Sequence, residues 1–408
     1  MSDINSYEFS GTPVDNIENV IQFPTSIFPR SYQKILFQDS IFNFYPYGEI
    51  SLKDEIGIIL DKMFFTEGFE WNFKLGSNEQ KIIRKGNSEA IGYLNHNYVW
   101  SEPLFNAEKI TSHFSGIQNF ALISSMYMKD DFYTRMYSNK KISAIVTEVL
   151  RDYNISSNKQ FLSTTSGTDD YPQYNITDKE FLNNLADVSY QVNKSPFFTF
   201  FNCKGEFYFM SLIDMFKQVP IGTYSLSESE QATIDDWTIQ NYSVLSEGLP
   251  LNRKNYKHTT YTLDSNGSIT SNIHELKDYY LKQGGKDKFT VRSKTVSGKN
   301  NCVNLGIKNA SKADLYLGKA NALFVNSQLT NQMEIVIRFN PQAVSGKTIN
   351  IQADRSDGKT RMSELSGNWL ITEQQCMCSD QGIPSQKLNI AKSAIQINQN
   401  NPFYSEFI

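Results

Sequence analysis

The stretch at residues 141–210 constrains the fold most strongly, because it combines two amphipathic helices with a hairpin. Apolar residues at helical spacing form one stripe on the first helix, and that stripe needs a packing partner. These residues are Ile142, Ile145, Val146, Val149 and Leu150. The second helix begins at a capping box, with Thr177 as the N-cap and Glu180 three residues later. Its predicted buried face consists of Phe181, Leu182, Leu185, Ala186 and Val188.

A hairpin is predicted after the second helix. Two aromatic-rich runs, residues 197–201 and 206–210, flank a turn that contains Asn202 and Gly205. Aromatic residues suit a pleated sheet, and Asn and Gly tolerate the backbone angles of a tight turn. Two helices and a hairpin make a compact α+β unit, which by itself specifies no function. A sugar-binding platform is a second interpretation of the aromatic runs, but the helices need the same apolar surface as a core.

Short strands are predicted on both sides of this unit. Residues 30–123 alternate apolar and polar side chains between turn residues, which is typical of a barrel or sandwich. Residues 331–341 give the clearest strand of the second half, residues 346–355 and 368–376 follow as its partners, and residues 258–272 read as a hairpin. We also expect a short helix or turn near 54–64, helices at 273–281 and 311–327, a linker at 130–139 and a surface connection at 224–237. No internal sequence repeat relates the two β regions.

Composition narrows the class of protein. A chain of 408 residues is too long for a single ordinary hydrophobic core, so two or more domains are expected. The composition, with 39% hydrophobic and 20% charged residues, indicates a folded, soluble protein. The net charge of −4 gives no basis for gripping nucleic-acid phosphates. The basic stretches at 252–258 and 286–294 are interpreted as solvated loops. The first residues lack the pattern of a signal peptide, and no apolar run is long enough to span a bilayer.

No catalytic, cofactor-binding or metal site is predicted. Free thiols are expected for the four cysteines, Cys203, Cys302, Cys376 and Cys378, of which the last two would share one face of a strand without further ligands. Surface or structural roles are expected for the histidines, His96, His113, His258 and His274, with His96 in a turn. Three adjacent carboxylate pairs begin at Asp130, Asp169 and Asp235. Neighbours in sequence diverge in direction, so solvated loop charge is the favoured interpretation of each pair.

Several motifs in the same order resemble phage baseplate hub proteins of the T-even type. The run "YSNKKISAIVTEVLRDYNI", then "YNITDKEFLNNLADVSYQV", then "FFTFFNCKGEFYFM" is similar to the middle domain of that family and of the type VI secretion spike protein. Downstream, "VSGKTINIQ", "LSGNWLITEQQCMCSD" and "SQKLNIAKSAI" look like the closing strands of the family's second barrel. The resemblance covers about half of the chain.

The resemblance implies a fold class, α+β and predominantly β. Two tube-like antiparallel β-barrels would flank and be joined by a smaller α+β domain. The expected division is a first barrel at 1–135, the α+β domain at 136–218, a second barrel at 219–395 with an insertion near 257–310, and a tail at 396–408. Because the chain ends soon after the last strand, the spike is expected to be a separate protein.

The resemblance also implies a function. Three subunits with two barrels each would form a homotrimeric ring of pseudo-sixfold symmetry between a threefold spike and a sixfold tail tube. The expected partners are the spike protein, tail tube or tube-initiator proteins and baseplate wedge proteins, with DNA passing through the lumen without specific binding. The protein would be a non-enzymatic virion component of a contractile tail, assembled in the host cytoplasm, without membrane insertion. The alternatives are a tail-associated cell-wall hydrolase and a secreted carbohydrate-binding module.

Overall fold

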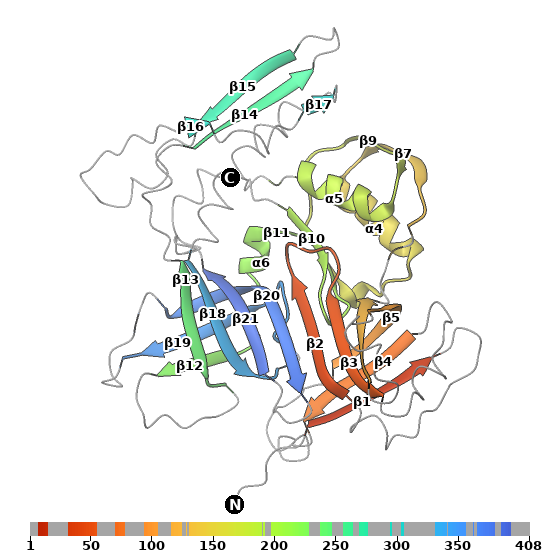
Figure 1. Cartoon of the computed structure of the whole chain (residues 1–408). Coiled ribbons are helices and arrows are strands. Elements are labelled where there is room, and N and C mark those ends of the chain that lie inside the picture. The colour runs from red at the N-terminus through yellow and green to blue at the C-terminus, as the bar shows by residue number, and fades with distance from the viewer. Residues whose placement is uncertain are drawn as a thin grey trace, which may run out of the picture.

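A computed structural model gives the fold of the chain (Figure 1). It describes residues 7–14, 32–54, 70–77, 94–104, 116–124, 128, 130–189, 191, 197–227, 237–246, 256–263, 269–275, 294–295, 303–305, 331–340, 342–355, 362, 365–379 and 385–392. The described elements are mostly strands. None of the helices in these ranges combines the length and apolarity needed to cross a bilayer.

The N-terminal half forms an antiparallel sheet. Its described strands are β1 (Tyr7–Val14), β2 (Tyr32–Ser40), β3 (Tyr47–Asp54), β4 (Glu70–Ser77), β5 (Leu94–Leu104) and β6 (Gly116–Ser124). Hydrogen-bonded neighbours follow the order β1-β4-β5-β6-β3-β2. The predicted β character of this region is therefore confirmed for these strands, but His96 lies within β5 and pairs with Phe73 rather than occupying a turn.

The C-terminal half forms a second set of strands. They are β12 (Thr223–Ser227), β13 (Asn241–Ser246), β18 (Asn331–Arg338), β19 (Thr348–Asp354), β20 (Gly367–Ser379) and β21 (Ser385–Lys392). Their order in space is β12-β19-β20-β21-β18-β13. The strands predicted at 331–341, 346–355 and 368–376 are confirmed as β18, β19 and β20. Their expected partnership was wrong, because β18 pairs with β13 and β21, whereas β19 and β20 pair with each other. Part of the expected surface connection at 224–237 is instead strand β12.

The two halves share one strand order. If the strands of each half are counted along the chain, both sheets run first, fourth, fifth, sixth, third, second. All neighbours are antiparallel in the first half, and in the second half the one exception is β12, which is parallel to β19. Chains that lack a sequence repeat do not often reach the same connectivity twice, because many orders are available to six strands.

Strand β20 joins the halves. Its first residues pair with β19 and its last residues pair with β2, while β21 lies along its other edge. A bulge at Thr372 marks the change of partner, and the Thr372 carbonyl oxygen accepts a 2.9 Å bond from the Ile41 N–H. The result is one continuous sheet, in which β2 and β20 lie side by side at the centre of the molecule (Figure 1).

The strand pairing in this sheet differs from the pairing expected for two separate closed barrels. Among the described residues the path of paired strands is open, with β1 at one end and β13 at the other. In the second half, one contact links β12 at one end of the strand order to the chain just before β13 at the other end. Ser225 in β12 forms a bridge with Thr238, three residues before β13, and the Ser225 N–H donates to the Trp237 carbonyl oxygen at 2.8 Å. The chain entering β13 therefore lies against β12.

A core fills the C-terminal half. Side chains from five of its strands meet there, and Trp369 is among the largest that are fully buried. The alternation of each strand aims these side chains to one face, as Met333, Ile335 and Ile337 show in β18. The Trp369 indole N–H donates to the Leu365 carbonyl oxygen at 2.9 Å, so the buried ring leaves no unpaired donor.

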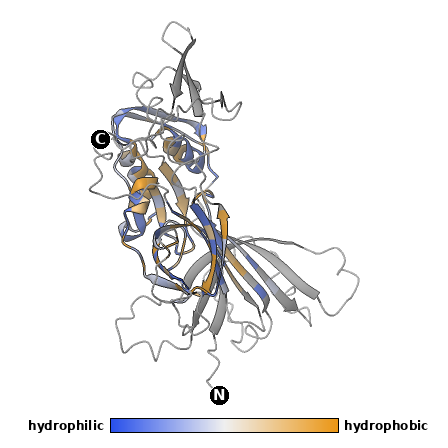
Figure 2. Ribbon diagram, turned by 90° about the vertical axis from the view of Figure 1, so that its left-hand side faces the viewer, coloured by the Kyte–Doolittle hydropathy of each residue, from blue (hydrophilic) through white to orange (hydrophobic). Residues whose placement is uncertain are grey.

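The α+β unit lies beyond one end of the two sheets in both views (Figures 1 and 2). Its predicted helices are confirmed as α4 (Ile142–Asp152) and α5 (Asp178–Val188). The capping box is also confirmed, since the Thr177 hydroxyl accepts from the Glu180 N–H and the Glu180 carboxylate accepts from the Thr177 N–H. The expected linker at 130–139 was wrong in part: β7 (Tyr133–Lys140) pairs with β9 (Asp169–Ile176) as a two-stranded ribbon.

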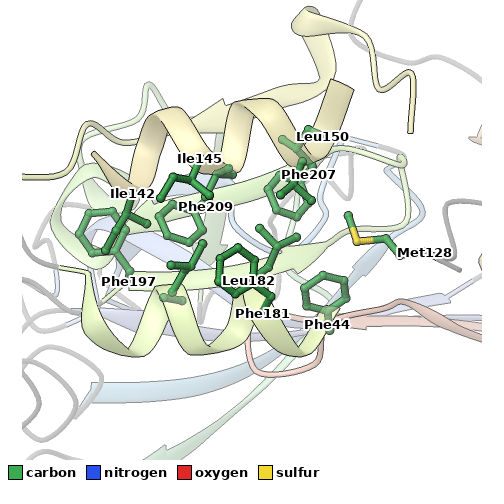
Figure 3. Close-up of a cluster of buried hydrophobic side chains, with 14 of the residues drawn as sticks. Phe44, Met128, Ile142, Ile145, Leu150, Phe181, Leu182, Phe197, Phe207 and Phe209 are labelled. Atoms are coloured by element: carbon green, nitrogen blue, oxygen red, sulfur yellow. The ribbon is translucent and has the colours of Figure 1, made fainter. Parts of the chain in front are cut away.

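The hairpin and the two helices share one core. Strands β10 (Phe197–Phe201) and β11 (Phe207–Ser211) pair antiparallel as predicted, and β8 (Gln160–Leu162), which follows the short helix η2 (Ser157–Lys159), adds a parallel strand. Alternate hairpin residues Phe197, Phe207 and Phe209 face the stripes of α4 and α5 (Figure 3). Phe44 and Met128 of the N-terminal half complete this cluster. The aromatic runs therefore serve as core.

The other face of the hairpin packs toward the C-terminal half. Phe200 and Tyr208 join helix α6 (Leu212–Phe216) in a cluster that includes Leu370 of β20 and Ala391 of β21. The hairpin is thus buried on both faces, which explains why β11 is buried along its whole length.

A separate sheet is formed between β13 and β18 in the chain. It contains β14 (Tyr256–Leu263), β15 (Ile269–Glu275), β16 (Lys294–Thr295) and β17 (Val303–Leu305). The hairpin predicted at 258–272 is confirmed by the antiparallel pairing of β14 and β15. The helix expected at 273–281 was wrong at its start, where residues 273–275 belong to β15. Its remainder, the short helix or turn expected near 54–64 and the helix expected at 311–327 lie outside the described residues.

Candidate functional site

A buried polar junction lies where the two halves and the α+β unit meet. Three segments that are distant in sequence contribute to it: the end of β2, the turn between β10 and β11, and the loop that leads from β18 to β19. Strand pairing between β2 and β20 brings the first and third segments together. The hairpin reaches them because both of its faces are packed.

Asp39 is the centre of the junction. Its side chain is 1% exposed and accepts bonds from the Cys203 N–H at 2.5 Å, the Ser345 N–H at 3.0 Å and the Ser345 hydroxyl at 2.6 Å. Burial raises the pKa of Asp39, and the bonds from Ser345 and Cys203 oppose that shift. One carboxylate therefore joins β2 to both other segments.

The hairpin turn is shaped to present its backbone to Asp39. The Asn202 side-chain oxygen accepts from the N–H groups of Lys204 and Glu206, at 3.0 and 3.1 Å. Gly205 follows in the left-handed region with φ 67, as Gly at that turn position readily does. Side-chain bonds of this kind fix a turn without help from solvent. Cys203 is thereby held with its N–H directed at the carboxylate.

A charged pair lies beside the turn. Glu206 contacts Lys347 at 3.1 Å and Lys204 at 3.3 Å, and it accepts a 2.8 Å bond from the Asn202 amide. Burial would raise the pKa of Glu206, but the two lysines and these bonds outweigh burial and lower it. Burial also lowers the pKa of Lys347, although Glu206 opposes the change. The pair joins the hairpin to the C-terminal half.

Stacked aromatic rings support the charged pair. Tyr208 stacks between Phe161 and Phe200, with 4.7 Å between ring centroids on each side. The Lys347 ammonium lies 3.9 Å from the centroid of the Phe161 ring. Next to it, Gly346 has φ +84, and a Cβ there would come within 2.7 Å of the Phe200 ring. The loop approaches the stack this closely because residue 346 has no side chain.

Amide side chains extend the junction into the second half. The Gln374 amide donates to the Cys203 sulfur at 3.2 Å, and the Gln386 amide donates to Gln374 at 3.2 Å. Gln386 in turn accepts from the Asn340 N–H at 2.8 Å, and the Asn340 amide donates to the Tyr224 hydroxyl at 2.9 Å. A chain of bonds therefore runs from β2 through the hairpin turn to β12.

This arrangement is built to hold segments in place. Its donors and acceptors are matched to one another, as buried polar groups in folded proteins usually are. No group of three or more His, Cys, Asp or Glu residues suited to a metal ion occurs among the described residues. The chemistry it supports is a rigid three-way joint.

Of the cysteines, histidines and aspartate pairs considered in the sequence, Cys203 belongs to the junction. Cys203 and Cys376 are buried thiols outside any disulfide, and Cys376 pairs with Phe37 across β20 and β2. The Asp169 and Asp170 side chains accept bonds from backbone N–H groups, at 2.8 Å each, at the start of β9. His113, Cys302 and the pair that begins at Asp235 lie outside the described residues. His258 and His274 are opposite each other in the backbone register of β14 and β15.

Sequence reasoning missed Asp39, Ser345 and Lys347. The one available signal was the position of Asp39 in the alternation of its strand, where it falls on the same face as Phe37 and Ile41. A charged residue on an apolar face needs partners if that face is buried. Partners that lie 164 and 306 positions away carry no local signature.

The fold and the junction define a class of protein. Two halves with the same strand order lie in one sheet, and an α+β unit packs against both of them. No protein-family model matches the chain, and no curated protein matches its sequence. Solved structures do match. A 43 kDa tail protein of prophage MuSo2 from Shewanella oneidensis aligns with TM-score 0.54 and 13% identity, covering 95% of this chain and 98% of that chain. A tail protein from Neisseria meningitidis MC58 aligns with TM-score 0.53 and 8% identity, covering 95% and 96%.

A component of the type VI secretion system from E. coli aligns with TM-score 0.45 and 10% identity, covering 89% of this chain and 74% of that chain. The two tail proteins span nearly the whole chain. The chain therefore shares its fold with these two tail proteins.

Proposed function

We propose that this protein is the structural hub of the baseplate of a contractile phage tail. In this proposal three copies form a ring of pseudo-sixfold symmetry that joins the central spike to the tail tube and surrounds the DNA channel. The protein acts by shape and contact, without catalysis, and it is a component of the virion that assembles in the host cytoplasm.

The observation that carries the proposal is the common strand order of the two halves. A ring of three identical chains has threefold symmetry, whereas two similar units in each chain give six similar units around the axis. Such a ring presents threefold symmetry on the side of a spike and near-sixfold symmetry on the side of a tube. The fold shared with a prophage tail protein and a second tail protein supports the same conclusion.

Each half acts as a barrel in this proposal, with the first at 1–135 and the second at 219–395. The bridge between Ser225 and Thr238 supports closure of the second barrel, because it connects the strand at one end of that sheet to the chain entering the other. The α+β domain spans 136–218, and the sheet of β14 to β17 belongs to an insertion near 257–310. Residues 396–408 form a tail.

A ring also requires a fixed angle between the two units of each chain. The junction around Asp39 provides that restraint, because it joins both halves and the hairpin through buried hydrogen bonds. Buried networks whose members are fully paired favour one geometry over others. Three copies with the same internal angle then close without strain.

The proposed partners follow from the position of a hub. A spike protein binds below the ring, tail tube or tube-initiator proteins bind above it, and wedge proteins surround it. DNA passes through the lumen without specific binding, which is compatible with the net charge of −4.

Native mass spectrometry tests the proposal. We expect the purified chain, alone or with its spike protein, to have three times the mass of the 46.7 kDa subunit. Negative-stain images should show a ring with six lobes. A monomer in both conditions would contradict the proposal, and so would the absence of the chain from purified virions.

A further inference from the structure

The outer face of the β7–β9 ribbon is an exposed apolar surface. Phe132, Met136 and Tyr174 are 66%, 59% and 78% exposed, and Pro172 is exposed beside Met136, with which it pairs. The opposite face of the ribbon carries Tyr137 and Gln173, which are buried against the rest of the α+β unit. We call Phe132, Met136, Pro172 and Tyr174 the ribbon patch.

The ribbon patch has an acidic rim. Asp131 lies next to Phe132, and Asp170 lies two residues before Pro172, on the same face of β9; both aspartates are exposed. Among the described residues near the ribbon, the two cations of β7 are already engaged. Arg135 contacts Asp178 and Asp152, and Lys140 contacts Glu148. Lys141, just after the end of β7, is also exposed. The exposed charges that lie nearest the ribbon patch in sequence are the two aspartates.

The ribbon also has open edges. In the described part of the chain β7 and β9 pair with each other and with no third strand. A two-stranded ribbon gains stability when another element covers its apolar face or extends it. In Figure 1 the ribbon lies on the side of the α+β unit away from the large sheet.

We propose that the ribbon patch docks an extended segment of a different tail protein, one that carries apolar side chains flanked by lysines or arginines. The apolar residues cover Met136 and Tyr174, and the basic residues meet Asp131 and Asp170. This inference rests on the proposed function, since it places the partner within the tail. A second copy using the same face is disfavoured, because a twofold contact would bring the acidic rims together.

Site-specific photocrosslinking in assembled virions tests this inference. The photoreactive residue p-benzoyl-phenylalanine is introduced in place of Met136, and in a matched control in place of Val219, which is 88% exposed in the loop after α6. The crosslinked peptide is then identified by mass spectrometry. We expect position 136 to yield an adduct with a different protein, through a peptide that holds apolar residues flanked by lysine or arginine.

Charge is tested by Asp131→Asn together with Asp170→Asn. Asparagine keeps the side-chain oxygen that accepts from the Asn139 N–H, so the ribbon should remain folded. Loss of two surface charges should lower the yield of the adduct by about fivefold. An unchanged yield would contradict the charge complementarity and overturn the proposal.

Other outcomes are equally informative. Absence of an adduct at position 136 in virions that contain the variant, an adduct with another copy of this chain, or the same partner peptide at positions 136 and 219 would each overturn the inference. Each leaves the hub proposal standing, because the protein is then still present in the tail. Absence of the chain from virions would instead contradict the proposed function.

Discussion

The Ser345 hydroxyl donates a 2.6 Å hydrogen bond to the Asp39 carboxylate, although the two residues are 306 positions apart. The same carboxylate holds the Cys203 N–H of the hairpin turn. Two halves of one connectivity and the unit between them are thus fixed at a single buried group. The following predictions test how much the architecture depends on this junction and on the loops around it.

Substitution Asp39→Ala should strongly destabilise the protein. It removes the acceptor for three buried donors, and leaving such groups unpaired should cost about 2–5 kcal/mol in the free energy of unfolding. Chemical denaturation measures the loss as a lower midpoint. The control Asp152→Ala removes a carboxylate that is 57% exposed and should change stability by less than about 1 kcal/mol. Equal effects of the two substitutions would show that Asp39 is not special.

Substitution Gly346→Ala should destabilise the contact between the loop and the aromatic stack. The new Cβ would lie 2.7 Å from Phe200, and φ is +84, so both packing and backbone are strained. We expect a loss of about 2–3 kcal/mol. The matched control Gly367→Ala has φ +116, but its nearest neighbour is the flexible end of Lys392 at 3.4 Å. A larger loss at Gly367 than at Gly346 would contradict the role of the close approach.

Sequence reasoning was sufficient where local chemistry decides the structure. The stripe of Ile145 and Leu150, the capping box at Thr177 and the aromatic hairpin specify their elements within a few residues of chain. It failed where the decisive partner is distant. The sequence of β7 indicates a linker because its partner β9 begins almost 30 positions later, and neither strand has a run of β-branched residues.

The common strand order of the halves was also beyond local reasoning. The two sheets share connectivity without a sequence repeat, because a strand needs only alternating polarity and many sequences satisfy it. The junction was hidden for a related reason. The sequence around Asp39 does not identify its partners. They are defined only in the folded chain, where β2 pairs with β20 and the Ser345 hydroxyl reaches the Asp39 carboxylate.

Substitution Thr177→Ala should loosen the start of helix α5. The Thr177 hydroxyl accepts from the Glu180 N–H at 3.2 Å, and loss of an N-cap costs about 1 kcal/mol. Hydrogen exchange should therefore accelerate at the amides of residues 178–181. In the control Thr147→Ala, the lost bond runs back to the Ser143 carbonyl oxygen on an exposed helix face, so little change is expected. Unaltered exchange in both variants would show that the cap does not limit fraying.

The pH dependence of stability should report the pair of Glu206 and Lys347. Burial acts to raise the pKa of Glu206, but Lys347, Lys204 and Asn202 lower it below its ordinary value of 4.5. A carboxyl whose pKa is lower in the folded state stabilises the fold above its unfolded pKa, and this contribution disappears as the pH falls through the folded value. Substitution Glu206→Gln should therefore lower the free energy of unfolding near pH 7, and the difference from wild type should shrink below about pH 4.

Asp39 has the opposite sign, because its raised pKa favours the fold as the pH falls, so the comparison must be made between variants that retain Asp39. Denaturant titrations of both proteins across this range measure the difference directly. A difference that stays constant with pH would mean that the Glu206 carboxylate contributes through its shape alone, and that the neighbouring lysines do not hold the hairpin to the second half by charge.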